Sequence, residues 1–92
     1  MQAYPEPLRP YVAATIRTLR HAREWSQQEL ANNVGVEARE ISILESGTRD
    51  PRLFTLQRLA DGLGIELYQL IWQAEALRRR VERQKREEPA DG

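Results

Sequence analysis

The sequence predicts an all-α protein of five helices, and three observations lead to this class. Ser26 and Glu29 have the spacing of a capping box, which opens a short amphipathic helix. Gly35 separates that helix from a second short amphipathic run, as in two helices joined by a tight turn. The chain then runs from Glu66 to Glu88 without Gly or Pro, long enough for a helix of about 34 Å.

The first helix is expected to begin near Pro10, since proline suits the first turn of a helix. Apolar residues then recur on one face up to Trp25, which is expected to cap the core rather than stack on a base. Residues 1–9 are expected to form an N-terminal arm, because the prolines near Tyr4 oppose a helix. This arm either reaches a groove or a partner, or has no role.

The two helices on either side of Gly35 form the outline of a helix-turn-helix, which makes double-stranded DNA the first partner to consider. The second of them is expected from about Glu37 to Gly47, with Ile41 and Leu44 facing inward. Its outer face then consists of Ala38, Arg39, Ser42, Ile43 and Ser46. A fourth helix is expected from Leu53 to Leu63, closed by Gly62 and Gly64.

The long last helix carries apolar residues at alternating spacings of three and four, as in a heptad seam. One interpretation is dimerisation through this seam, whereas the other is a helix folded back on the first helix, with no second subunit. The candidate dimerisation residues are Leu67, Leu70, Ala74, Leu77 and Val81.

Composition limits the range of functions. The 92 residues, 40% of them hydrophobic, fit one small domain. The absence of cysteine excludes disulfides and thiolate zinc sites. No stretch is long and apolar enough to span a membrane, so a cytoplasmic location is expected. With His21 as the only histidine and no phosphate-binding glycine loop, neither catalysis nor a metal or other cofactor is expected.

Net charge does not favour nucleic acid in an obvious way, because basic and acidic residues are equal in number. A local basic region is expected from Arg39, Arg49 and Arg52, near the two ends of the second short helix. Glu37 and Glu40 in its first turn favour the helix dipole but repel phosphate. The basic stretch from 78 to 86 is either a solvated tail or a contact to an anionic surface.

Several motifs together resemble the lambda-repressor-like family of DNA-binding proteins, also called the Cro and cI type or XRE family. The resemblance covers roughly Val12 to Trp72. Its most specific parts are Gln27-Gln28-Glu29-Leu30-Ala31, Val34-Gly35-Val36, the Ile41 and Leu44 pair, and Leu44-Glu45-Ser46-Gly47. It implies a compact five-helix domain at residues 10–72, here with an extension of the last helix at 73–88 and a disordered end at 89–92.

The resemblance also implies roles for individual residues. Glu45 is expected to pair with Arg20, and Gln27 to contact phosphate while bracing the reading helix. Arg39 is the first candidate for a bidentate contact to guanine. Family members usually carry a polar residue where Ile43 stands, so this side chain meets either a thymine methyl or a protein. The candidate DNA-binding residues are Ser26, Gln27, Glu37, Ala38, Arg39, Ser42, Ile43 and Arg49.

These observations predict a sequence-specific transcriptional regulator that acts as a homodimer on a pseudo-palindromic operator. The competing hypothesis is a protein-interaction module, including an antitoxin-like protein, that uses the same scaffold with weak or no DNA binding. Neutral charge and the acidic first turn support this second hypothesis.

Overall fold

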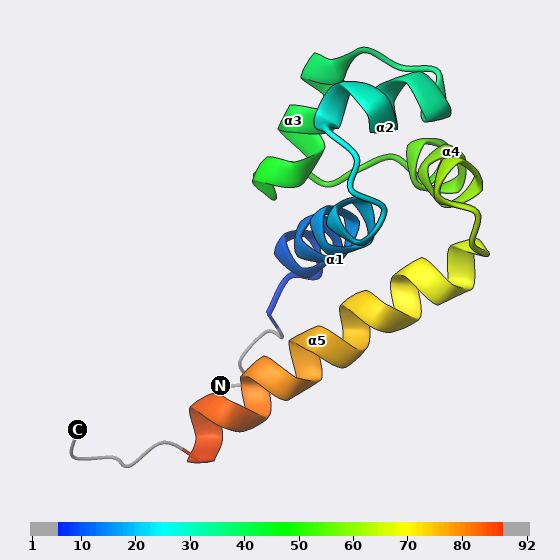
Figure 1. Cartoon of the computed structure of the whole chain (residues 1–92). Coiled ribbons are helices and arrows are strands. Elements are labelled where there is room, and N and C mark those ends of the chain that lie inside the picture. The colour runs from blue at the N-terminus through cyan, green and yellow to red at the C-terminus, as the bar shows by residue number, and fades with distance from the viewer. Residues whose placement is uncertain (1–5, 88–92) are drawn as a thin grey trace.

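The computed structural model describes residues 6–87, and this part of the chain consists of five helices without a strand (Figure 1). The all-α prediction is confirmed. Between residues 6 and 87 no helix combines the length and the apolar character that a membrane crossing requires. The helices are α1 (Arg9–Ala22), α2 (Gln27–Val34), α3 (Ala38–Ser46), α4 (Leu53–Leu63) and α5 (Leu67–Glu87).

The two ends of α2 are formed as the sequence predicts. The Ser26 hydroxyl accepts from the Glu29 backbone amide at 3.0 Å, and the Glu29 carboxylate accepts from the Ser26 amide at 2.9 Å. These two bonds satisfy amides that a helix start leaves without partners. At the other end Gly35 has φ +84°, a left-handed conformation that side chains with a Cβ rarely adopt. The chain therefore turns sharply into α3.

Gly62 was expected to help close α4, and that expectation is wrong. The helix continues to Leu63 and is capped by Gly64, whose φ is +75°. A Cβ on Gly62 would lie 2.7 Å from the Val34 Cγ2 atom, which is closer than a carbon contact allows. Gly62 thus permits α4 to approach α2 closely, and this role depends on packing that the local sequence does not reveal.

The core receives one fully buried large side chain from every helix. Each of these five side chains is at most 1% exposed, and burial of such a side chain is worth about 1.5–3 kcal/mol. Each helix therefore has one inward face, and all five helices contribute to the hydrophobic core. The five residues are Ile16, Leu30, Ile41, Leu59 and Leu70.

The first half of α5 belongs to this core, and α5 packs across α1 (Figure 1). Leu70 and Ala74 are both 0% exposed, and Leu67 packs against the same cluster. The assignment of Leu70 and Ala74 to a dimer interface is corrected accordingly, since neither side chain can reach a second copy. The alternative interpretation, a helix folded back on α1, describes the packing, with Leu77 and Val81 half-buried farther along.

The described part of the predicted N-terminal arm lies near the end of α5. Arg9 is already the first residue of α1, so the helix begins one residue earlier than expected. The Glu6 carboxylate lies 3.4 Å from the Lys85 ammonium group in α5. Tyr4 and the disordered end expected at 89–92 lie outside the described residues.

Candidate nucleic-acid interface

The reading helix of the predicted helix-turn-helix is α3, and its inner face is anchored in the core. Ile41 is fully buried, and Glu45 is only 4% exposed. On the outer face Arg39 and Ser42 are exposed, as expected. Ala38 and Ile43 are only partly exposed, and Ala38 packs against the hydrophobic core. The apolar side chains of the outer face are therefore less exposed to solvent than the sequence suggests.

A buried ion pair holds α3 against α1, as the family resemblance implies. Arg20 Nε donates to Glu45 Oε2 at 2.7 Å, and Arg20 Nη2 donates to Glu45 Oε1 at 2.8 Å. Gln27 Nε2 also donates to Glu45 Oε1, at 3.0 Å, which brings in the start of α2. Arg17 adds a bond from Nη1 to the Glu45 carbonyl oxygen. One carboxylate thus fixes the relative positions of three helices.

The surroundings of Glu45 favour its charged form. Burial alone would raise the pKa of this carboxyl group, but hydrogen bonds from Arg20 and Gln27 and the charges of Arg20 and Arg17 outweigh burial. The net result is a pKa of Glu45 below its ordinary value. The hydrogen bond to Glu45 in turn raises the pKa of Arg20, against the effect of burial. Both partners are therefore charged at neutral pH.

Two open hollows border the outer face of α3. One, of about 750 Å³, extends from the α2–α3 turn and includes Glu37, Arg39 and Arg58 in its lining. The other, of about 300 Å³, extends toward the loop before α4 and includes Arg52 in its lining. Glu40, Ile43 and Arg49 line both.

Four of the eight predicted DNA-contact residues therefore share one surface. Glu37, Arg39, Ile43 and Arg49 come together at the first hollow. Ser42 and Ala38 lie on α3 but line neither hollow. Ser26 and Gln27 start α2, where the Ser26 hydroxyl is engaged in the capping box and the Gln27 amide in bracing Glu45.

Arg58 is a residue of this surface that sequence reasoning missed. Its Nη2 donates to the carbonyl oxygens of Val34 at 3.0 Å and of Gly35 at 2.7 Å. A helix end leaves such carbonyls without partners, and a cation there also favours the helix dipole. Arg58 therefore braces the turn of the helix-turn-helix from α4. The unsatisfied carbonyls were foreseeable, but no local pattern identifies a donor 23 residues away.

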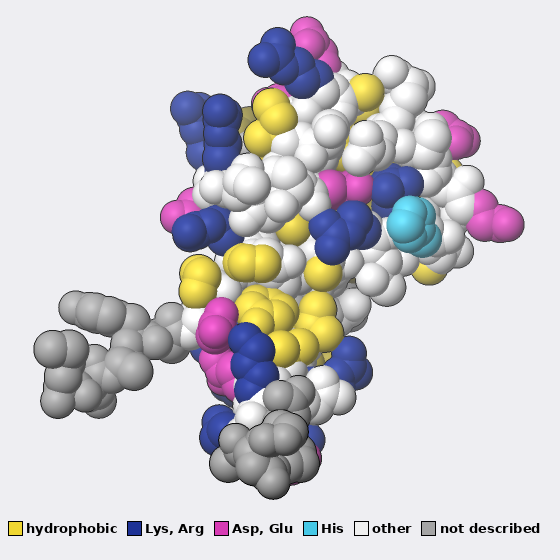
Figure 2. Space-filling model, turned by 90° about the vertical axis from the view of Figure 1, so that its left-hand side faces the viewer, with side chains coloured by type: hydrophobic (Ala, Val, Ile, Leu, Met, Phe, Trp, Pro, Cys, Tyr) yellow, Lys and Arg dark blue, Asp and Glu magenta, His cyan; other side chains and the backbone are white. Residues whose placement is uncertain are grey.

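The arginines of the domain separate into two groups by their partners. Those of α1, of its C-cap and of α4 bond to protein groups; Arg23, the C-cap residue, donates to the carbonyl oxygens of Leu19 and Leu63. Within residues 6–87 the side chains of Arg39, Arg49 and Arg52 make no hydrogen bond or ion pair. All three are exposed and surround the outer face of α3. A local basic region therefore exists although basic and acidic side chains are interspersed over the face in Figure 2.

The surface has no feature of a metal site, since residues 6–87 contain no group of three His, Asp or Glu that could hold a metal ion.

Trp25 is half-buried against the core, and the Arg23 guanidinium lies 5.9 Å from the centre of its ring. This position agrees with the core-capping role expected for Trp25 and leaves the α3 surface as the candidate interface.

Two short helices joined at a left-handed glycine, with the second helix exposed between two hollows, define the helix-turn-helix class. Comparison with known proteins agrees, because the helix-turn-helix domain family matches residues 12–67. The chain belongs to this family, and the resemblance to lambda-repressor-like helix-turn-helix proteins is confirmed.

Individual relatives extend the comparison. An HTH-type transcriptional regulator of Mycobacterium bovis is 42% identical over 57 residues, which are 62% of this chain and 22% of the relative. The cryptic phage CTXphi transcriptional repressor RstR of Vibrio cholerae is 35% identical over 63 residues, or 68% of this chain and 57% of that protein. This chain thus spans about a fifth of the length of its mycobacterial relative.

Comparison with a solved structure extends the similarity in fold beyond residues 12–67, the part matched by the family. The clp gene regulator ClgR of Corynebacterium glutamicum superimposes with a TM-score of 0.81 at 22% identity. The superposition covers 89% of this chain and 87% of ClgR. At this identity the likeness concerns the fold alone.

Proposed function

We propose that this chain is a sequence-specific transcriptional regulator that binds double-stranded DNA through α3 and acts as a homodimer. The observation that carries the proposal is that the arginines of the domain fall into two groups according to their bonding partners. Those on α1 and α4 brace the fold, whereas Arg39, Arg49 and Arg52 surround α3 without a partner among the described residues. The names of the relatives, which are transcriptional regulators and a phage repressor, support the same function.

In the proposed complex α3 lies in the major groove. Arg39 donates two hydrogen bonds from its guanidinium group to one guanine, and Ile43 contacts a thymine methyl group. Ala38 and Ser42 face base edges on the same helix, and Glu37 accepts from a cytosine amino group. These contacts specify sequence.

The phosphate backbone is contacted from both sides of α3. Arg49 and Arg52 at its C-terminal side supply positive charge, which gives affinity without specifying sequence. At the start of α2 the Ser26 hydroxyl or amide and one N–H of the Gln27 side-chain amide donate to phosphate, while the other N–H of that amide keeps its bond to Glu45. Such binding regulates transcription by occluding a promoter or by contacting polymerase.

The test is selection of random duplexes by the purified chain at near-physiological salt, followed by sequencing of the retained fragments. Two similar half-sites about one helical turn apart, roughly 34 Å, support a dimeric regulator. Arg39→Ala should abolish the motif, whereas Arg86→Ala, which removes the same charge at the far end of α5, should retain it. Retention without a motif that vanishes as salt rises would contradict the proposal and favour the protein-interaction module.

A further inference from the structure

The outward face of α5 carries two large aromatic side chains that the core does not use. Tyr68 and Trp72 are each 70% exposed and lie one helical turn apart. Ala76, Arg79 and Arg83 follow at spacings that keep them on the same side, and all three are exposed. We call these five residues the outer stripe. Contiguous exposed apolar surface marks an interaction site, whereas single scattered apolar residues do not.

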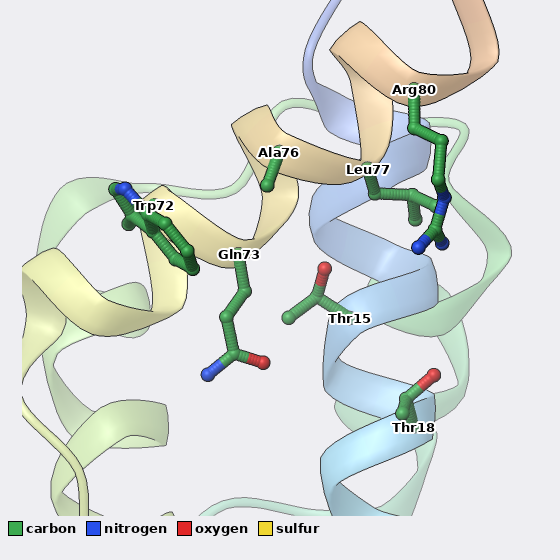
Figure 3. Close-up of a pocket in the computed structure, with 7 residues that line it drawn as sticks. All are labelled: Thr15, Thr18, Trp72, Gln73, Ala76, Leu77 and Arg80. Atoms are coloured by element: carbon green, nitrogen blue, oxygen red, sulfur yellow. The ribbon is translucent and has the colours of Figure 1, made fainter.

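The surface around Trp72 is hollowed on both sides. A groove of about 250 Å³ separates α5 from α1, with Trp72 at one end, Arg80 at the other and the small Ala76 between them (Figure 3). Thr15 and Thr18 of α1 form its opposite wall. A second groove, of about 280 Å³, is lined by Trp72, Ala76, Arg79 and Arg83 and by Glu75. The outer stripe thus offers both a protruding indole and recesses that can receive one.

The order of residues along the outer stripe is self-complementary. Tyr68 and Arg83 are equally distant along the chain from the midpoint between Glu75 and Ala76, and so are Trp72 and Arg79. A second α5 laid antiparallel about this midpoint therefore places each aromatic ring opposite an arginine. Guanidinium groups stack favourably on Trp and Tyr faces. The only cation–π contacts within residues 6–87 involve Trp25 and Phe54, so the rings of the outer stripe are not used in this way within the chain.

We propose that the occupant of the outer stripe is a second copy of this chain, docked antiparallel so that each α5 contacts the other around Ala76. Trp72 then stacks on Arg79 of the partner subunit, and Tyr68 stacks on Arg83 of the partner subunit. The proposal rests on the proposed function, since it specifies the surface through which the homodimer forms. This surface is opposite to the seam of Leu70 and Ala74 that the heptad spacing indicates.

Charge selects the antiparallel direction. The half of α5 beyond Ala76 carries Arg79, Arg80, Arg83 and Arg86 on or near the outer stripe, whereas the half before it carries the aromatics. A parallel arrangement would bring the arginine-rich halves of the two copies together, and like charges at contact repel. The antiparallel arrangement separates them and pairs each with an aromatic half. A two-fold contact of this kind closes on itself and produces a dimer rather than a fibre.

The area is adequate for a reversible dimer. A large aromatic side chain buries about 150–250 Å². Two such side chains from each copy, at their present exposure, supply about half of the roughly 1,200 Å² of a small specific interface. The rest comes from the walls of the two grooves beside Trp72.

Sedimentation equilibrium on the full chain is the first test. The wild type should be a dimer, and Trp72→Ala should raise the dissociation constant at least 100-fold without changing the helical circular dichroism. Phe54→Ala is the matched control, because Phe54 is an aromatic residue of similar exposure, 66%, on α4 outside the outer stripe. A wild-type monomer at high concentration, or a dimer that Trp72→Ala leaves unchanged, would overturn the inference.

Cross-linking tests the position of the two-fold axis and does not depend on removing the indole. The chain contains no cysteine, so a single introduced thiol reports one contact. Ala76→Cys should form an intermolecular disulfide rapidly under mild oxidation, because the proposed axis passes beside this residue. Gln57→Cys, an exposed position on α4, should remain unlinked under the same conditions. Equal rates at the two positions would contradict the antiparallel arrangement.

Binding to a selected DNA site separates this inference from the function on which it rests. If Trp72→Ala binds a single half-site normally but loses tight binding to the paired site, both proposals are supported. If Trp72→Ala binds the paired site as tightly as the wild type, the outer stripe is not the dimer surface, although the regulator function stands. If the wild-type dimer forms through the outer stripe but selects no DNA, the proposed function fails, and the stripe remains only as a self-association surface.

Discussion

Arginines in two regions of the molecule have opposite surroundings. Arg20 and Arg58, on α1 and α4, point into the protein and bond to a carboxylate or to helix-terminal carbonyls. Arg39 and Arg49, on and after α3, are exposed and bond to no protein group within residues 6–87. The first region uses guanidinium groups to hold helices together, and the second leaves them available for a ligand.

The difference explains why overall charge is a poor guide to this surface. A formal net charge of zero hides the exposed guanidinium groups around α3 that have no partner within residues 6–87, because it counts them together with arginines such as Arg20 and Arg58, which bond to a carboxylate or to helix-terminal carbonyls. Substitutions in the first region should therefore change the free energy of unfolding, whereas those in the second should change DNA affinity at constant stability.

The largest effect is expected from Arg20→Ala. It leaves the buried Glu45 carboxylate without its ionic partner, which should lower the free energy of unfolding by about 3–5 kcal/mol. Urea denaturation followed by circular dichroism measures this loss. Arg86→Ala, an exposed arginine at the end of α5, should change stability by less than about 0.5 kcal/mol. A loss from Arg20→Ala as small as that of the control would break the comparison.

Acid should remove the same stabilisation. The folded-state pKa of Glu45 is lowered, so the pair contributes fully above the unfolded-state pKa, near the ordinary 4.5, and its contribution is lost as pH falls through the folded-state value. In the Glu45→Gln variant the side chain at position 45 has no ionisable group. The difference in unfolding free energy between wild type and Glu45→Gln should therefore be constant from pH 7 to about 5 and shrink below about pH 4. A difference that grows toward low pH would contradict the lowered pKa.

An intermediate effect on stability is expected from Arg58→Ala. The Val34 and Gly35 carbonyls lose their side-chain donor, and because the Gly35 bond is exposed, the cost should be about 1–2 kcal/mol. Hydrogen exchange of amides in α2 and α3 should also accelerate, since the turn between them loses its brace. Arg52→Ala on the same side of the molecule should alter neither quantity.

In the second region Arg39→Lys separates charge from geometry. The lysine keeps the positive charge but cannot form the planar bidentate contact, so discrimination at one base pair should fall by about 1–3 kcal/mol, or roughly 5–150-fold. Binding to nonspecific duplex and the urea midpoint should stay as in the wild type. Fluorescence anisotropy on matched and mismatched sites measures both affinities. A uniform loss on all sequences would assign Arg39 to phosphate instead.

The smallest effect is expected from Arg49→Ala. Loss of one phosphate contact should reduce the slope of log affinity against log salt by about 0.9 without changing the preferred sequence. Arg9→Ala is the control, because Arg9 is ion-paired to Asp50 at 3.1 Å rather than available to DNA. An unchanged slope for Arg49→Ala would place Arg49 outside the contact.

The fold was largely predictable because its signals are local. The capping box at Ser26 and the left-handed turn at Gly35 depend on residues within a few positions of one another. The pairing of Arg20 with Glu45 was available only through resemblance to a family, since 25 residues separate the partners. Arg58 and Gly62 act across α2 and α4, and their roles became evident only once the helices were packed.

The α5 seam illustrates a different limit. Apolar spacings of three and four are the same whether a helix packs on its own domain or on a second copy. Leu70 and Ala74 satisfy this spacing and are buried within the chain. Tyr68 and Trp72 on the other face are each 70% exposed, and no periodic spacing identified that exposure from the sequence. Of the predicted contact residues on α3, Arg39 and Ile43 line the same hollow and Ala38 and Ser42 do not, and the roles of all four toward DNA stay predictions.

The two faces of α5 have a consequence for how such regulators diverge. The inner face is constrained by the core, and α3 by the DNA that we propose it binds, whereas the outer stripe touches neither. Matched substitutions at Tyr68, Trp72 or Arg79 that keep the proposed dimer contact can therefore accumulate after gene duplication without a change in the fold or in the bases that α3 is proposed to read. Changed charge or shape there excludes mixed pairs between the copies. Duplicated regulators can become insulated from one another through a single helix face while still reading the same DNA.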